Sequence, residues 1–206
     1  EEVVKEMNRL GIMVDVSHIS DSSFFDVIKL SKTPVIASHS SIREICGHPR
    51  NFSDDMLDAL KENNGVIQIC MLNSYLIESA ANARSDSAFN ATMTKYNYFK
   101  GLSDDEYKAG VGEMRSLKTR FPKDPATVSI AVDHIDYVVN RIGIDHVGIG
   151  TDFDGGGGLE DCKDHSEMEN FTLELLKRGY SEEDIKKIWG ENFLRVFREV
   201  EKAARI

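Results

Sequence analysis

Two histidines follow short runs of β-branched residues at matching places in the chain. His18 comes near the end of VDVSHIS, residues 14–20, and His39 near the end of VIASHSS, residues 35–41. They are 21 positions apart, about one strand–helix repeat. If their strands are neighbours in a parallel sheet, the backbones lie about 4.8 Å apart, close enough for two neutral imidazoles to bind one cation. The pattern predicts a metal site, with two hydrogen-bonded core histidines as the alternative.

Asp152 is the third candidate, because it follows the apolar run HVGIGT, residues 146–151. A catalytic zinc usually has three protein ligands, so two histidines do not complete a site. Asp152 is the candidate ligand within this chain; alternatively, it orients a ligand or carries a proton beside a metal-bound water. The stretch TDFDGGGG also resembles a calcium loop, but Lys163 stands where that loop needs its twelfth-position Glu. We therefore exclude a calcium site.

Arg50 is the candidate substrate-binding residue. It lies in GHPRN, on a loop expected to open at the same edge of the sheet as His39. A planar guanidinium suits a carboxylate, although a salt bridge at a helix entry is the alternative. Nucleophile chemistry is not supported, because the chain has no G-x-S-x-G elbow and Cys46 near His48 has no specific spacing.

The other histidines are expected to have no part in this chemistry. His134 lies within a helical pattern and is expected to face solvent or a neighbouring helix. His48, His146 and His165 are expected in ordinary loops.

Four apolar runs predict the buried strands that must position these residues. They cover residues 11–16, 34–38, 65–72 and 146–151, and the polar residues at their carboxyl ends are His18, His39, Asn73 and Asp152. None of the runs alternates cleanly, which is typical of parallel strands covered on both faces. Helical patterns cover residues 21–32, 53–65, 124–143, 166–179 and 181–202, with N-cap serines predicted at positions 53 and 181.

The alternation of strands and helices predicts a parallel α/β sheet of right-handed βαβ units. No G-x-G-x-x-G or G-x-x-x-x-G-K-[ST] motif follows a strand, so a nucleotide-binding sheet is not supported. We predict a (β/α)8 TIM-like metallohydrolase barrel, in which chemistry collects at the carboxyl ends of the strands. Because only four strands are found, residues 1–206 are expected to form a single domain portion, roughly the C-terminal half of the barrel.

Residues 76–124 do not follow the repeat. They are polar, with one helix expected at about residues 104–118 and capped by Ser103. Because they follow a strand directly, we expect this excursion on the catalytic face, where it covers or shapes the site. A surface ornament or a dimer contact is the alternative.

The composition is that of a folded acidic protein. Lys and Arg number 25 and Asp and Glu number 35, for a net charge of −10, which argues against nucleic acid or an anionic membrane as partner. Three cysteines without a C-x-x-C pair indicate reduced thiols and a cytoplasmic location. No run of apolar residues is long enough for a membrane span.

The chain starts abruptly as a helix, which suggests that it is cut from something longer.

Four stretches resemble the membrane dipeptidase (renal dipeptidase) family, the M19 peptidases. They are MNRLGIMVDVSHIS, PVIASHSSIREICGHPRN, VDHIDYVVNRIGIDHVGIGTDFDG and WGENFLRVFREVE, which span most of the chain outside residues 76–124. The resemblance implies a (β/α)8 barrel with two zinc ions per complete active site, bridged by a carboxylate and a hydroxide. It implies hydrolysis of dipeptides, with a D-residue tolerated at the C-terminal position.

By motif, the resemblance implies a role for five residues. His18 and His39 correspond to the histidines of the second zinc. Arg50 corresponds to the residue that grips the substrate carboxylate, and Tyr75, in NSY, to a lesser substrate contact. Asp152 corresponds to the group that contacts the substrate amine and handles the proton.

The family's other metal ligands are expected in an N-terminal half of the barrel. No H-x-D motif precedes residue 11, and His134-Ile135-Asp136 lies within a helix. We therefore expect this chain to be inactive or nearly so alone, with the missing half as partner and a homodimer as the assembly. An amidohydrolase-like barrel acting on lactams or cyclic amides, or a non-catalytic assembly half, are the alternatives.

Overall fold

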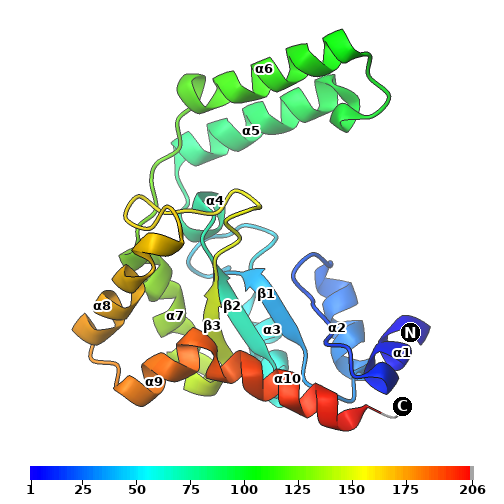
Figure 1. Cartoon of the computed structure of the whole chain (residues 1–206), viewed down its shortest axis with the longest axis vertical. Coiled ribbons are helices and arrows are strands. Elements are labelled where there is room, and N and C mark those ends of the chain that lie inside the picture. The colour runs from blue at the N-terminus through cyan, green and yellow to red at the C-terminus, as the bar shows by residue number, and fades with distance from the viewer. Residues whose placement is uncertain (205–206) are drawn as a thin grey trace.

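The computed structural model describes residues 1–204 and shows a small parallel sheet below a protruding helical hairpin (Figure 1). The strands are β1 Ile36–Ser40, β2 Val66–Cys70 and β3 Val147–Gly150. The helices are α1 Glu2–Leu10, α2 Asp21–Leu30, α3 Asp54–Glu62, α4 Asn73–Leu76, α5 Ala80–Lys95, α6 Asp104–Arg120, α7 Val128–Ile142, α8 Glu169–Lys177, α9 Glu182–Lys186 and α10 Asn192–Ala203.

The strands pair in parallel in sequence order, β1 beside β2 and β2 beside β3. The fourth predicted strand, residues 11–16, is reduced to a bridge beside β1. There Val16 N–H donates to the carbonyl of Ile36 at 2.8 Å, and Ile36 N–H donates to the carbonyl of Val14 at 3.0 Å. This order is that of consecutive units in a (β/α)8 barrel. Within residues 1–204 the outer edges of segment 14–16 and of β3 carry no further strand, so the sheet is part of a barrel.

One face of the sheet forms the main core. Ile67 and Ile69 of β2 point into it and are fully covered, together with Leu57 of α3, Ile135 of α7 and Leu175 of α8. Burying an aliphatic side chain of this size contributes about 1.5–3 kcal/mol. The helix predicted for residues 124–143 is confirmed as α7. It begins at Val128, because Thr127 caps it and accepts from the N–H of Ile130.

The other face of the sheet is covered near its lower end by α10, which runs across the amino ends of the strands (Figure 1). Ile36 and Val66 pack there against Val196 and Val200. Farther along this face, a Cβ on Gly150 would collide with the carbonyl oxygen of Ser38. The curvature that brings the ends of β1 and β3 together therefore requires glycine at position 150.

The helix starts follow the local sequence. The side chains of Ser53, Ser103 and Ser181 cap α3, α6 and α9, as predicted. In α6 and α9 a carboxylate at the third helical position also bonds back to the cap, which satisfies two otherwise unpaired donors. The last predicted helix, residues 181–202, is broken into α9 and α10 by a wider turn at Lys187–Glu191, where Gly190 leaves helical geometry.

The excursion forms a hairpin of two helices, α5 and α6, which stands above the carboxyl ends of the strands (Figure 1). The expected helix at 104–118 is present as α6. The sequence did not predict α5, because its Ser-, Ala- and Asn-rich residues form no apolar stripe. At its far end the hairpin is joined by aromatic rings: Phe99 stacks on Tyr96 with ring centroids 5.9 Å apart and meets Tyr107 edge to face at 5.7 Å.

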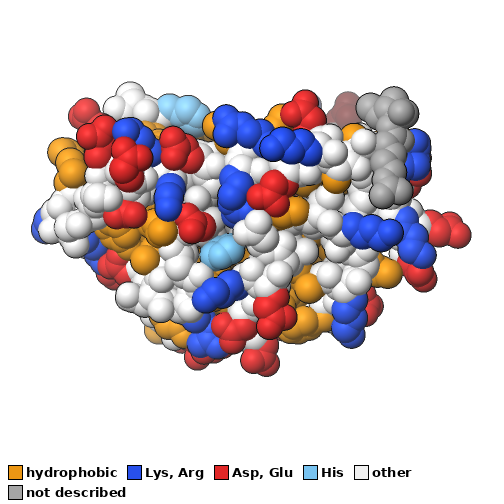
Figure 2. Space-filling view, turned by 90° about the horizontal axis from the view of Figure 1, so that it is seen from below, with side chains coloured by type: hydrophobic (Ala, Val, Ile, Leu, Met, Phe, Trp, Pro, Cys, Tyr) orange, Lys and Arg blue, Asp and Glu red, His pale blue; other side chains and the backbone are white. Residues whose placement is uncertain are grey.

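The face opposite the hairpin carries intermingled charges of both signs and no large basic patch (Figure 2). In residues 1–204, every helix is too short or too polar to cross a bilayer.

Candidate active site at the carboxyl ends of the strands

The structure brings the two predicted histidines together. The Nε2 atoms of His18 and His39 lie 2.7 Å apart, and the ring centroids are 4.8 Å apart. Two nitrogens that bind one zinc at about 2.0–2.1 Å each lie a little over 3 Å from each other. The spacing of the two Nε2 atoms is therefore slightly shorter than that of two nitrogens on one metal ion.

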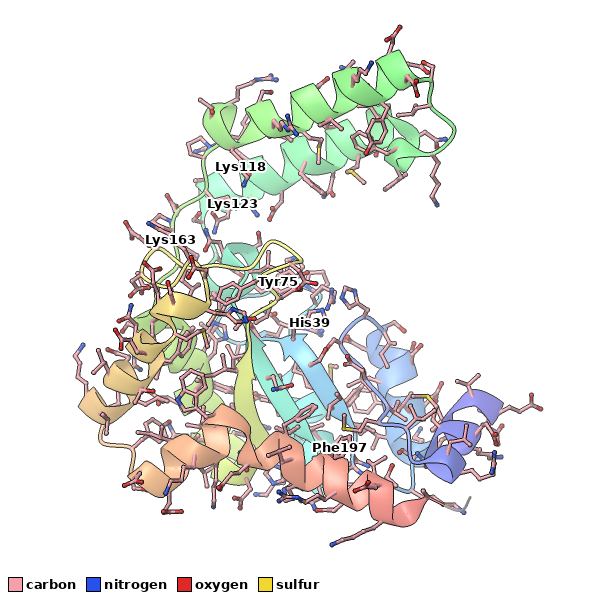
Figure 3. The ribbon with its side chains drawn as sticks, in the orientation of Figure 1. His39, Tyr75, Lys118, Lys123, Lys163 and Phe197 are labelled. Carbon is pink, nitrogen blue, oxygen red and sulfur yellow. The ribbon has the colours of Figure 1, made fainter. Side chains whose placement is uncertain are left out.

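A β-bulge in β1 aims His39 at this point. Ala37 pairs with Ile67 and Ser40 with Ile69, so one extra residue lies between them on β1. A bulge bends the strand and changes the direction of the side chains that follow. The N–H of His39 no longer joins the sheet and donates instead to Ser17 Oγ at 3.0 Å. In Figure 3 His39 lies at the upper end of β1, whereas Phe197 lies at the opposite end of the sheet.

Arg50 lies against His18, although it follows the end of β1 by ten residues. Its Nη1 donates to His18 Nδ1 at 3.0 Å, and its Nε donates to the carbonyl of Ser17 at 2.9 Å. Tyr75 completes this contact, with its hydroxyl 3.4 Å from Arg50 Nη1 and its ring centroid 5.5 Å from the guanidinium carbon. The structure thus gathers His18, His39, Arg50 and Tyr75, as predicted, at one edge of the sheet.

One nitrogen of Arg50 lacks a partner. Its Nη2 is buried and makes no hydrogen bond within the described part of the chain. Leaving a buried polar group unpaired costs about 1–3 kcal/mol, and more for a charged group. An anionic ligand with two oxygens, such as a carboxylate, would satisfy this donor.

The electrostatics of the site keep His18 neutral. Burial lowers the pKa of His18, and the nearby charges of Arg50 and His39 lower it further. A neutral imidazole is the form that binds a metal. Burial also raises the pKa of the Tyr75 phenol, so it stays protonated and can donate a hydrogen bond.

Two buried side chains connect the loop that carries Arg50 with the short helix α4 that carries Tyr75. Asn51 Nδ2 donates to the carbonyls of Cys46 and Tyr75, each at 2.8 Å. His134 Nδ1 accepts from the N–H of Ile42 at 3.0 Å, and its Nε2 donates to the carbonyl of Leu76 at 3.0 Å.

Of the two alternatives expected for His134, exposure to solvent was wrong, because the side chain is fully buried; the neighbouring helix is confirmed, since its Nε2 contacts the carbonyl of Leu76 at the end of α4. His146 is also not an ordinary loop residue, since it is buried and contacts the carbonyl of Gly65 at 2.8 Å. His48 remains in a loop, where its ring packs 4.4 Å from that of Tyr75.

Asp152 follows β3 directly, with a left-handed φ of 52°. Its carboxylate fills the space that a side chain on Gly155 would need, and it accepts no hydrogen bond from any other residue among positions 1–204. Its negative charge acts on His18 in the sense that raises the pKa of the imidazole. Asp152 is therefore an unengaged carboxylate whose charge acts on His18.

The histidine pair fits a metal but does not complete a metal centre. Within residues 1–204 no group of three or more His, Cys, Asp or Glu side chains could hold an ion together, so Asp152 does not join the pair as a ligand. Asn73, which also follows a strand, accepts instead from the N–H of Ala126 at 3.1 Å. A catalytic zinc held by His18 and His39 would need at least one further protein ligand from outside this chain.

The sequence argument missed Asp15 and Ser38. Ser38 Oγ lies 2.5 Å from Asp15 Oδ2 and 2.8 Å from His39 Nδ1, so the three side chains form one hydrogen-bonded chain. An acid within the segment VDVSH and a serine directly before the second histidine were the available signals.

Comparisons with known proteins agree on one family. A family model described as membrane dipeptidase (peptidase family M19) matches residues 1–206. Dipeptidase tcpJ of Claviceps purpurea (strain 20.1) and dipeptidase verJ of Clonostachys rogersoniana are each 36% identical to this chain over 206 residues and cover 98% of it. The crystal structure of the probable dipeptidase PvdM from Pseudomonas aeruginosa matches with a TM-score of 0.80, at 34% identity over 98% of this chain.

The chain spans only part of these relatives. It covers 38% of tcpJ, 41% of verJ and 54% of the PvdM chain.

Proposed function

Because the chain belongs to the membrane dipeptidase family, peptidase family M19, we propose that it supplies the C-terminal part of the active site of a zinc-dependent dipeptidase. The observation that carries this proposal is the convergence of the His18 and His39 Nε2 atoms beside the unpartnered Nη2 of Arg50. A metal-binding pair next to a free carboxylate-binding group suits a short peptide with a free C-terminus.

In this proposal His18 and His39 hold one of two zinc ions through Nε2. Bound zinc supplies a water of lowered pKa, so that hydroxide is available near neutral pH. The remaining ligands come from the part of the barrel that lies outside this chain. The 206-residue chain by itself is therefore expected to be inactive or nearly so.

Arg50 and Tyr75 bind the C-terminal carboxylate of the substrate. The guanidinium offers two parallel N–H donors, and the neutral phenol a third. A clamp on the carboxylate contacts a group that is the same in either enantiomer. This supports tolerance of a D-residue at the C-terminal position.

Asp152 moves the proton. Its carboxylate accepts no other hydrogen bond within residues 1–204, so it is free to take the proton of the attacking water and to pass it to the leaving amine. Its position after β3, across from the histidines, supports this role.

Two wider expectations stay proposals. The open edges of segment 14–16 and β3 support pairing with the missing half of the barrel, and a homodimer of the complete protein is proposed on the resemblance alone. A cytoplasmic location remains a prediction from the three free thiols, Cys46, Cys70 and Cys162.

A substrate panel tests the proposal in the full-length protein. We expect zinc-dependent hydrolysis of L-Ala-L-Ala and L-Ala-D-Ala, weak activity on the carboxyl-amidated analogues, and none on a cyclic dipeptide. Preferred cleavage of the cyclic amide, or equal rates on free and amidated dipeptides, would contradict the dipeptidase proposal and favour the lactam-hydrolase alternative.

A further inference from the structure

We propose that Asp15 and Ser38 are positioning residues that hold the ring of His39 with its proton on Nδ1 and its Nε2 lone pair directed at the site. The proposal deepens the proposed function, since it concerns one of the two histidines assigned to zinc. It concerns hydrogen bonds present within this chain, and it can be tested without zinc.

The direction of the hydrogen bonds follows from what each atom can do. An ionised carboxylate only accepts, so the Ser38 hydroxyl donates its proton to Asp15 Oδ2, 2.5 Å away. The lone pair of Ser38 Oγ then faces His39 Nδ1 at 2.8 Å. That nitrogen must carry the proton, which leaves Nε2 as the lone-pair atom of the neutral ring.

Asp15 is held in its ionised form and in place by the backbone. Its Oδ1 accepts from the N–H of Ser17 at 3.0 Å and from the N–H of Ser38 at 3.1 Å, so it bridges segment 14–16 and β1. Desolvation raises the pKa of this carboxyl, but the hydrogen bonds from Ser38 and Ser17 outweigh it and the net pKa is lowered. The acceptor at the end of the chain is therefore a fixed negative charge.

The ring of His18 is held in the opposite way. Its Nδ1 faces Arg50 Nη1, which can only donate, so its proton lies on Nε2 and points to His39 Nε2 at 2.7 Å. Of the two rings, His39 alone presents a metal-binding lone pair without rearrangement. Carboxylate partners of this kind commonly set the tautomer and the affinity of a metal-binding histidine. Here a serine hydroxyl lies between the carboxylate and the ring.

The test compares three single variants of the full-length protein. Ser38→Ala breaks the chain but leaves the two backbone bonds of Asp15 intact, whereas Ser38→Thr keeps a hydroxyl. Ser41→Ala is the matched control, because Ser41 lies two residues after His39 and its buried hydroxyl makes no hydrogen bond within the described residues. Zinc affinity is measured by competition with a chromogenic chelator, and the tautomer of His39 by ¹⁵N NMR of the imidazole nitrogens in the zinc-free protein.

We expect Ser38→Ala to weaken zinc binding about 10–100-fold and to move the His39 proton partly or wholly to Nε2. Ser38→Thr should restore both properties, and Ser41→Ala should keep the wild-type tautomer. A wild-type His39 with its proton on Nε2, or zinc binding unchanged by Ser38→Ala, would overturn the proposal.

Failure of the proposed function gives a different result. A wild-type protein that neither binds zinc nor cleaves dipeptides, but carries the His39 proton on Nδ1 and loses this tautomer in Ser38→Ala, retains the positioning role and refutes only the dipeptidase assignment. The ¹⁵N NMR spectrum of the His39 imidazole therefore tests the positioning role independently of enzymatic activity.

Discussion

Arg50 donates to the imidazole Nδ1 of His18 at 3.0 Å, so the substrate-binding candidate and a metal-binding candidate are direct hydrogen-bond partners. A neutral imidazole that binds a metal through Nε2 carries its proton on Nδ1, where it would face a second donor. Metal binding at His18 and this bond to Arg50 are therefore mutually exclusive. Filling the metal site releases the guanidinium toward the pocket where its Nη2 already lacks a partner.

This relationship predicts that Arg50→Ala does not weaken zinc binding. Removing the cation also removes a donor that competes for His18 and a positive charge beside the metal. Dipeptide kcat/KM should nevertheless fall about 10- to 100-fold, because a charge-assisted hydrogen bond contributes about 1.5–3 kcal/mol. Chelator competition gives the zinc affinity, and steady-state kinetics on free and amidated dipeptides give the substrate effect. An equal loss of kcat/KM on free and amidated dipeptides would show that Arg50 does not bind the substrate carboxylate.

Asp152→Asn should separate zinc binding from turnover. The amide keeps the size of the side chain, but it cannot take a proton from water. Zinc content, measured by atomic emission, should therefore stay at the wild-type level, while kcat falls about 10²- to 10⁴-fold. Unchanged dipeptide hydrolysis would exclude Asp152 as the proton carrier, and loss of zinc would make it a ligand instead.

The burial of His134 should make the stability of the fold sensitive to acid. Burial lowers the pKa of its imidazole from 6.5 to about 4. Between these values the unfolded chain binds the proton and the folded chain does not, so the free energy of unfolding falls as the pH drops from about 6.5 to about 4. The whole difference corresponds to about 3 kcal/mol.

His134→Gln tests this pH dependence, because glutamine can donate to the carbonyl of Leu76 but does not titrate. Urea unfolding at about pH 7, pH 5.5 and pH 4.5 should show a smaller loss of stability with acid in the variant, from a lower value at neutral pH. Parallel pH profiles for variant and wild type would show that other groups cause the loss.

Gly150→Ala should destabilise the sheet where its strands converge. The added Cβ would meet the backbone oxygen of Ser38 and the side chain of Gln68. Overpacking of this kind typically costs about 1–3 kcal/mol. Gly112→Ala is the matched control, because Gly112 lies in α6 with open space around it, and alanine there should stabilise the helix by about 0.5–1 kcal/mol. Equal melting temperatures for the two variants would contradict the close approach of β1 and β3.

The order of the elements, and the edge of the sheet at which the polar side chains lie, could be predicted from the amino-acid sequence alone. Continuous apolar runs identify β1, β2 and β3 because a strand buried on both faces needs apolar residues at successive positions. Serine caps and apolar stripes identify α3, α6 and α7 for equally local reasons. The rule that parallel strands open at one edge then predicted that His18 and His39 meet.

Only the tertiary structure decided how these side chains meet and what holds them. The bulge in β1, the Asp15–Ser38–His39 chain and the contact from Arg50 to His18 join residues from separate segments, and no periodicity within one segment encodes such a contact. The sequence left the burial of His134 undecided for the same reason. A histidine within an amphipathic helix is compatible with exposure or burial, and its two backbone partners, at Ile42 and Leu76, become its neighbours only when the chain folds.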